Sequence, residues 1–228
     1  MKNSIGKQIV RAIALALIGG LIAAAACSCA PINGSGAQSE KAKINMIAGT
    51  WQLEDDEDTR IKFGRDGSFD NGERSQDGYT AKFAFKKMMV VNYEDDGYPE
   101  TILTLIEVGG NTLKVSYSPE EERVLKRAGG KAKKADSIVG KWTADDYDAT
   151  YTFAENGRFE LKANGEVVYE GTYEIKEVLS MLFYYEDGEL FDMDAVFYEL
   201  SGNKLTLTEI DNEGNPDTED YWVFKRVK

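Results

Sequence analysis

The chain has 228 residues with 27 basic and 40 acidic side chains, two cysteines and no histidine, and its formal net charge is −13. Without histidine, Ser-His-Asp and Cys-His catalysis, histidine-ligated zinc and an imidazole pH switch are excluded. The acidic balance argues against nucleic-acid binding, because phosphate recognition needs clustered Lys and Arg. With 42% hydrophobic and 11% aromatic residues, the chain has enough apolar surface to bury a core.

Residues 1–26 have the pattern of a secretion signal. Three basic residues precede an unbroken apolar run at 12–26, and small residues then lead to Cys27. A run of this length is short for a membrane span, which needs roughly 20 residues. The segment resembles the precursor of a bacterial lipoprotein, in which the lipobox Cys becomes the acylated first residue of the mature chain. The resemblance implies lipidation at Cys27.

Two alternatives to this signal are open. Cys29 is a second candidate acceptor, although its lipobox would hold a Cys in the middle, and simple cleavage after Ala26 would leave two free thiols.

No cysteine follows residue 29, so no disulfide is expected in the folded body. Residues 27–43 are small and polar, which predicts a flexible tether. After cleavage the chain keeps 24 basic and 40 acidic residues, a net charge of −16, so acyl chains rather than the protein surface must provide membrane attachment.

The remainder contains two copies of one pattern, at 44–128 and 136–228, separated by a Gly- and Lys-rich linker at 129–135. Each copy begins with Gly-X-Trp, continues through a strand end with a tight turn, an acidic turn and a Gly-Asn turn, and closes on a basic strand. The two sets of matches, in order, are Gly49–Trp51 with Gly140–Trp142, Ile61–Phe69 with Tyr151–Phe159, Tyr93–Gly97 with Tyr185–Gly188, Gly110–Leu113 with Gly202–Leu205, and Leu125–Arg127 with Phe224–Arg226.

Alternation of apolar and polar residues predicts that both copies are antiparallel β. Ala81, Phe83 and Phe85 alternate with polar residues, and Leu205 and Leu207 do the same in the second copy. Turn signals recur every 8–12 residues, which predicts strands of about six residues in a meander that closes into a small barrel or sandwich.

Each copy resembles the lipocalin-like domains of bacterial lipoproteins. The resemblance implies two tandem small antiparallel up-and-down β-barrels, with the Trp of Gly-X-Trp at the closed end and a cation from the last strand covering its indole. It assigns these roles to Trp51 and Trp142 and to Arg127 and Arg226. The neighbouring Lys126 and Lys225 are alternative cations. Such a cation–π contact contributes roughly 0.5–2 kcal/mol.

The barrel interiors are the candidate binding sites. An eight-stranded barrel either fills itself with side chains or holds one small ligand, and both outcomes are open for this chain. The second copy is richer in aromatic residues, so any ligand is expected there. The candidate lining residues are Tyr151, Phe153, Phe159, Tyr173, Phe183 and Phe197.

Acidic loops are the remaining candidates. The loop at 211–217 alternates acidic and amide side chains, a composition that suits calcium, but its Gly stands one position early for an EF-hand and no helix pair flanks it. A solvated acidic hairpin loop is the simpler interpretation. We expect no metal and no cofactor.

The sequence predicts a membrane-anchored envelope lipoprotein that acts as a non-enzymatic binding or interaction module. Its partners would be the membrane, through N-terminal acyl chains, and a small apolar ligand or an envelope protein. The alternative is a structural or solubilising acidic protein with packed barrels, and an enzyme is a distant third. The body is expected outside the cytoplasm, at the outer membrane if the host is Gram-negative.

Overall fold

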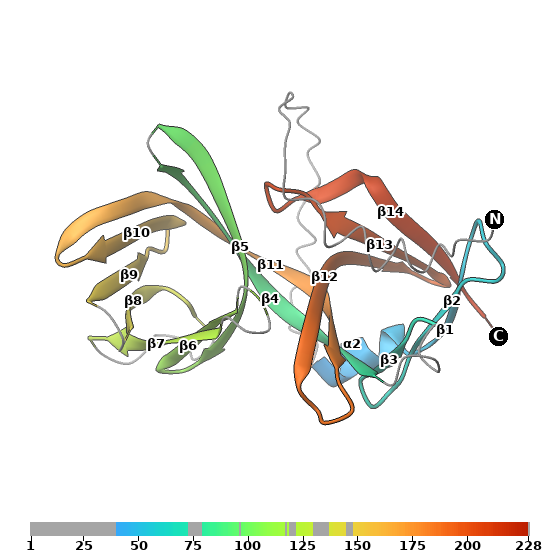
Figure 1. The fold of residues 1–228 in the computed structure, drawn as a ribbon. Coiled ribbons are helices and arrows are strands. Elements are labelled where there is room, and N and C mark those ends of the chain that lie inside the picture. The colour runs from blue at the N-terminus through green and yellow to red at the C-terminus, as the bar shows by residue number, and fades with distance from the viewer. Residues whose placement is uncertain are drawn as a thin grey trace.

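The protein is all-β in the computed structural model, which describes residues 40–72, 79–95, 97–116, 118, 122–129, 137–144 and 148–227 (Figure 1). The signal segment, Cys27, most of the tether and nearly all of the linker lie outside these residues. Within the described part of the chain there are 14 strands and one short helix.

The helix and the first seven strands belong to the first copy of the repeat. They are α2 (Glu40–Ile47), β1 (Gly49–Leu53), β2 (Arg60–Phe63), β3 (Ser68–Asp70), β4 (Thr80–Asp95), β5 (Tyr98–Gly109), β6 (Thr112–Ser116) and β7 (Glu122–Ala128). Residues 40–43, which the sequence placed in a flexible tether, are therefore the first half of α2.

The second copy supplies the other seven strands. They are β8 (Gly140–Ala144), β9 (Ala149–Phe153), β10 (Arg158–Ala163), β11 (Glu166–Tyr184), β12 (Leu190–Ser201), β13 (Lys204–Ile210) and β14 (Pro216–Arg226). The prediction of uniformly short strands is wrong. It fails most for β4 and β11, which have 16 and 19 residues, and also for β5, β12 and β14, which have 12, 12 and 11. Neither β4 nor β11 is interrupted by a tight-turn dipeptide such as Asn-Gly or Asp-Gly.

The strands form one closed ring of antiparallel neighbours. Each described strand pairs with the strands before and after it in the chain, and β1 pairs with β14. In addition, β4 and β11 pair with each other across the ring, over 14 residue pairs from Tyr93–Gly171 to Thr80–Tyr184. This second pairing divides the ring into two smaller circuits of hydrogen-bonded strands.

Each circuit contains strands from both copies of the repeat. The first circuit consists of β1, β2, β3, the first half of β4, the second half of β11, β12, β13 and β14. The second circuit consists of the second half of β4, β5 to β10, and the first half of β11. In Figure 1 the two circuits form two lobes, and β4 and β11 run from one lobe into the other. The pairing therefore does not show two tandem barrels that each close within one copy.

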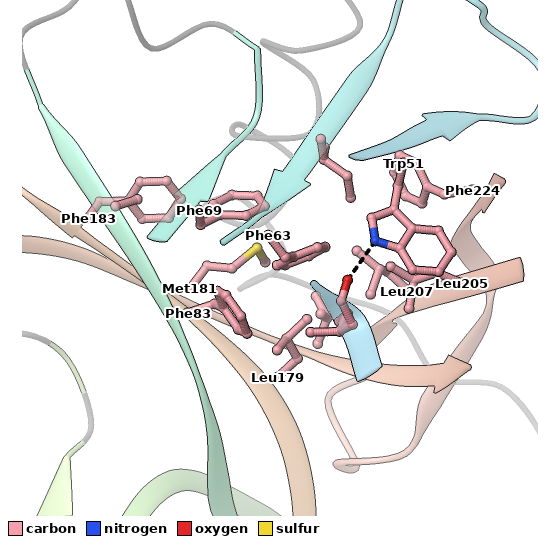
Figure 2. Close-up of a cluster of buried hydrophobic side chains, with 14 residues drawn as sticks. Trp51, Phe63, Phe69, Phe83, Leu179, Met181, Phe183, Leu205, Leu207 and Phe224 are labelled. Carbon is pink, nitrogen blue, oxygen red and sulfur yellow. Dashed lines mark hydrogen bonds between the residues drawn. The ribbon is translucent and has the colours of Figure 1, made fainter. Parts of the chain in front are cut away.

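Three clusters of buried apolar residues accompany this arrangement. The first fills the first circuit around Trp51, Phe63 and Phe224, as Figure 2 shows. The second lies inside the second circuit around Trp142 and Phe153. The third is built from Met88, Val90, Leu105 and Val178. The consecutive residues 88–91 of β4 are thus buried on both faces of the strand, as in sheets covered on both sides.

A substitution at Gly171 tests the close pairing of β4 with β11. A Cβ atom at this position would lie 1.9 Å from the backbone oxygen of Asn92 on β4, so any side chain must push the paired strands apart. We expect Gly171→Ala to lower the free energy of unfolding by about 2 kcal/mol or more. Denaturant unfolding followed by tryptophan fluorescence measures this change.

Gly109→Ala is the matched control on β5. Its new methyl group would meet the side-chain Oγ1 of Thr112 at 2.9 Å and no backbone atom, and a side chain moves more easily than a paired strand. We expect a cost below about 1 kcal/mol. Equal stabilities of the two variants would contradict the close β4–β11 contact.

Candidate functional site

Each circuit contains one tryptophan–arginine pair, which seals one of its ends. The guanidinium carbon of Arg226 lies 4.2 Å from the ring centre of Trp51, and that of Arg127 lies 4.0 Å from the ring centre of Trp142. Both tryptophans are fully buried. In each pair the two residues lie opposite each other on neighbouring antiparallel strands, β1 with β14 and β8 with β7. The resemblance to lipocalins implied contacts of this kind.

The partners come from different copies of the repeat. Trp51 of the first copy is covered by Arg226 of the second, and Trp142 of the second copy is covered by Arg127 of the first. Pairing within one copy would have joined Trp51 to Arg127. The alternative cation Lys225 instead bonds the carboxylate of Glu54 at 2.7 Å.

Backbone carbonyls fix these pairs. Trp51 Nε1 donates to the oxygen of Ile47 at 2.8 Å, and Arg226 donates to the oxygens of Ala48 and Met46, both at 2.6 Å. The second pair repeats the pattern, with Trp142 bonded to Ile138, and Arg127 to Val139 and Ser137. Because both terminal nitrogens of each guanidinium group donate to carbonyls before a Trp strand, both arginines hold that segment in place.

The glycine of Gly-X-Trp makes room for the arginine. Gly49 and Gly140 have φ angles of +141° and +135°, which L side chains rarely adopt. A Cβ atom at Gly49 would lie 2.9 Å from Nη1 of Arg226, and one at Gly140 would lie 2.6 Å from Nη1 of Arg127. The motif is therefore explained by packing at the closed end.

The second circuit encloses a cavity of about 190 Å³. Its lining is mostly apolar and comes from six strands, β4, β5, β6, β7, β9 and β10, with Tyr169 of β11. The lining residues are Met89, Val91, Tyr93, Ile102, Thr104, Val115, Arg123, Leu125, Tyr151, Phe153, Phe159, Leu161 and Tyr169.

The six predicted lining residues fall into three places. Tyr151, Phe153 and Phe159 line the cavity. Tyr173 packs beside it, with its ring centre 5.1 Å from that of Phe153 and its hydroxyl donating to Ala154 O at 2.8 Å. Phe183 belongs to the apolar cluster of the first circuit, and Phe197 packs against the third cluster. The sequence analysis missed the part of the wall that β4 to β7 supply, because it expected the second copy to form a closed barrel from its own strands alone.

The polar groups of the cavity are a few hydroxyls and one guanidinium. The rings of Tyr93 and Tyr169 lie 4.7 Å apart. Burial, with Tyr169 and the charges of Glu100 and Asp95, raises the pKa of Tyr93 above its ordinary value, so its hydroxyl stays protonated. Thr104 donates its hydroxyl to Ser116 O at 3.0 Å.

The first circuit carries bulkier residues at equivalent places. Counting back from the two sealing arginines, Arg123 and Leu125 of the second circuit correspond to Trp222 and Phe224 of the first. Phe224 is only 2% exposed and Trp222 packs against the same cluster. At these two positions the first circuit therefore has the bulkier side chains.

A carboxyl group also points into the first circuit. Asp194 pairs with Met181 as Ile102 pairs with Val91, so it occupies the place of a cavity-lining residue. It is only 6% exposed. Burial, with the charges of Asp192 and Glu209, raises the pKa of Asp194 to about 7.

The acidic loop at 211–217 uses its oxygens internally. Asp211 Oδ1 accepts hydrogen bonds from the backbone N–H groups of Glu213 and Asn215, at 2.9 and 2.7 Å. Lys176 donates to Gly214 O at 2.7 Å and to Asn215 Oδ1 at 2.9 Å. Within the part of the chain that the structure describes, no group of three or more acidic or Cys side chains has an arrangement that would hold a metal ion.

Comparison with protein-family models, with curated proteins and with solved structures finds no significant match. Among the described residues, no helix is both long and apolar enough to cross a membrane.

Asp194 makes stability depend on pH. A carboxyl group whose pKa rises from 3.8 when unfolded to about 7 when folded contributes stability below the lower value and loses it as pH rises through 7. We expect Asp194→Asn to stabilise the protein at pH 8 by about 2 kcal/mol or more, and to change it by less than about 1 kcal/mol at pH 4. Denaturant titrations at several pH values measure this difference.

Asp148→Asn is the control, because Asp148 is exposed on the second copy. Its variant should follow the wild-type profile. If Asp194→Asn also follows the wild-type profile from pH 4 to pH 8, the carboxyl group is ionised in the folded protein without cost, and its assigned burial is wrong.

Proposed function

We propose that this protein is a lipid-anchored envelope lipoprotein that binds a small apolar ligand in the cavity of the second circuit, without catalysing a reaction. In this proposal each circuit is a small lipocalin-like barrel. Cys27 carries the acyl chains, and the residues before α2 hold the body away from the bilayer. The body faces outside the cytoplasm, at the outer membrane in a Gram-negative host.

The cavity is the observation that carries this proposal. Apolar cavities of about 150 Å³ stay dry and bind benzene, and this one has a volume of about 190 Å³. Leaving such a volume empty costs stability through lost contacts, so a ligand that fills it binds favourably. Aromatic side chains such as Tyr151 and Phe159 in its wall suit an apolar guest.

A structural role as an acidic spacer is the second candidate. The observation that favours it is the first circuit, where buried aromatic rings pack directly on one another; the ring centres of Phe63 and Phe83 lie 5.0 Å apart. A spacer requires only packed interiors and a charged surface. Ligand binding to the second circuit separates the two candidates.

Leu125→Phe is designed to fill the cavity. The equivalent position of the first circuit is Phe224, so the scaffold accommodates this ring at this place. All described residues lie after 39, so the chain 28–228 retains every described contact. We expect it to bind 1-octanol in isothermal titration calorimetry, and Leu125→Phe to weaken binding at least tenfold while keeping its melting temperature.

Phe224→Leu is the matched control in the first circuit. It removes the same ring from the other interior, and should lower stability by about 1 kcal/mol or more without changing the affinity for 1-octanol. Binding that survives Leu125→Phe, or that is lost in Phe224→Leu alone, would contradict the assignment to the second circuit.

Anchoring is tested at the cysteines, which lie outside the described residues. We expect the wild type, expressed in its host, to incorporate a palmitate analogue and to sediment with membranes, because the acylated Cys supplies its attachment. Cys27→Ser should lose the label and give a soluble, unprocessed or secreted form. Cys29→Ser should remain labelled, and an unlabelled wild type would refute the lipoprotein assignment.

A further inference from the structure

We propose that the ligand of the second circuit is a small amphiphile: an apolar chain or single ring of about eight carbons that carries one anionic group, held by Arg123. This inference rests on the proposed function and adds the chemical class of the ligand. The apolar part follows from the cavity volume of about 190 Å³ and its apolar lining.

Arg123 places a positive charge at the rim of an apolar chamber. It stands near the start of β7, opposite Val115 of β6, and two residues before Leu125 on the same face of the strand. The residue is exposed although it lines the cavity. Its side chain therefore faces both the cavity and solvent.

The guanidinium suits a carboxylate or phosphate group. Its planar fork of five N–H donors binds two oxygens side by side, and it can hold a neighbouring protein group and a ligand together. The other arginine of β7, Arg127, is committed to carbonyls and Trp142 at the sealed end. A ligand that enters with its apolar end first therefore leaves its charged end beside Arg123.

Glu100, the carboxylate on the inward face of β5, lies at a different level from Arg123. Glu100 shares the inward face of β5 with Ile106, and Ile106 is level with Val115 and hence with Arg123. Six residues of strand separate Glu100 from that level, which is about 20 Å. The backbone of Glu100 thus lies more than two Debye lengths of about 8 Å from the level of Arg123 at physiological salt.

The two circuits differ in charge at this place. The residue equivalent to Arg123 in the first circuit is Trp222, which packs against the apolar cluster. The fold does not need a cation at this position, since the first circuit has the indole of Trp222 there. The arginine is specific to the circuit that has this cavity, which associates it with the ligand.

The test compares octanoate with 1-octanol, which have the same chain and differ in charge. Calorimetry at pH 7.5 on residues 28–228 should show octanoate binding about tenfold more tightly than 1-octanol, the effect of one charge-assisted hydrogen bond at an exposed rim. Arg123→Leu should abolish this preference and retain 1-octanol binding. Arg158→Leu removes the same charge from the outer face of β10 and should keep the preference.

The results distinguish a failure of this inference from a failure of the proposed function. Equal affinities for the two probes in the wild type, or a preference that survives Arg123→Leu, would overturn the anionic class while 1-octanol binding still supports the cavity. If neither probe binds, both the inference and the proposed function fail.

Discussion

The pairing of β4 with β11 is the constraint on which the rest of the structure depends. These strands continue beyond the length at which the other hairpins turn, and they pair along 14 residues at the centre of the molecule. Each therefore belongs to both circuits, and their outer face is covered by the cluster around Met88, Val90 and Val178. Because of this pairing, the first circuit is completed by β12 to β14 of the second copy. The second circuit is completed by β8 to β10 of the second copy together with β5 to β7 of the first.

Both sealed ends and the cavity are consequences of this crossing. Each tryptophan meets an arginine of the other copy, and the cavity wall combines β4 to β7 of the first copy with β9 to β11 of the second. A repeat also allows its two interiors to diverge. Phe224 and Trp222 fill one circuit where Leu125 and Arg123 leave space and place a charge in the other. The first circuit also buries the carboxyl group of Asp194, whose pKa rises to about 7, and this burial lowers stability at higher pH.

Much of the fold could be predicted from local sequence, and the exchange between copies could not. Alternation at Ala81, Phe83 and Phe85 predicted antiparallel strands, and the Gly-X-Trp and basic-strand patterns picked out the four residues of the sealed ends. Because the copies are alike, Arg127 and Arg226 fit either tryptophan, so chemistry alone cannot choose between pairing within and between copies. The choice depends on strand length. The uninterrupted run from Thr80 to Asp95 was the available signal, and without it the cavity wall from β7, including Leu125, was missed.

The most direct test of this account is cleavage of the connection between the two copies. A protease site inserted at 130–136, outside the described residues, would allow the folded protein to be cut once between β7 and β8. Native mass spectrometry and size-exclusion chromatography then report whether the fragments separate. If each circuit contains strands of both copies, the fragments remain one 1:1 complex of unchanged mass and part only in denaturant. Two fragments that separate without denaturant and each keep a folded β spectrum would contradict the shared β4–β11 architecture.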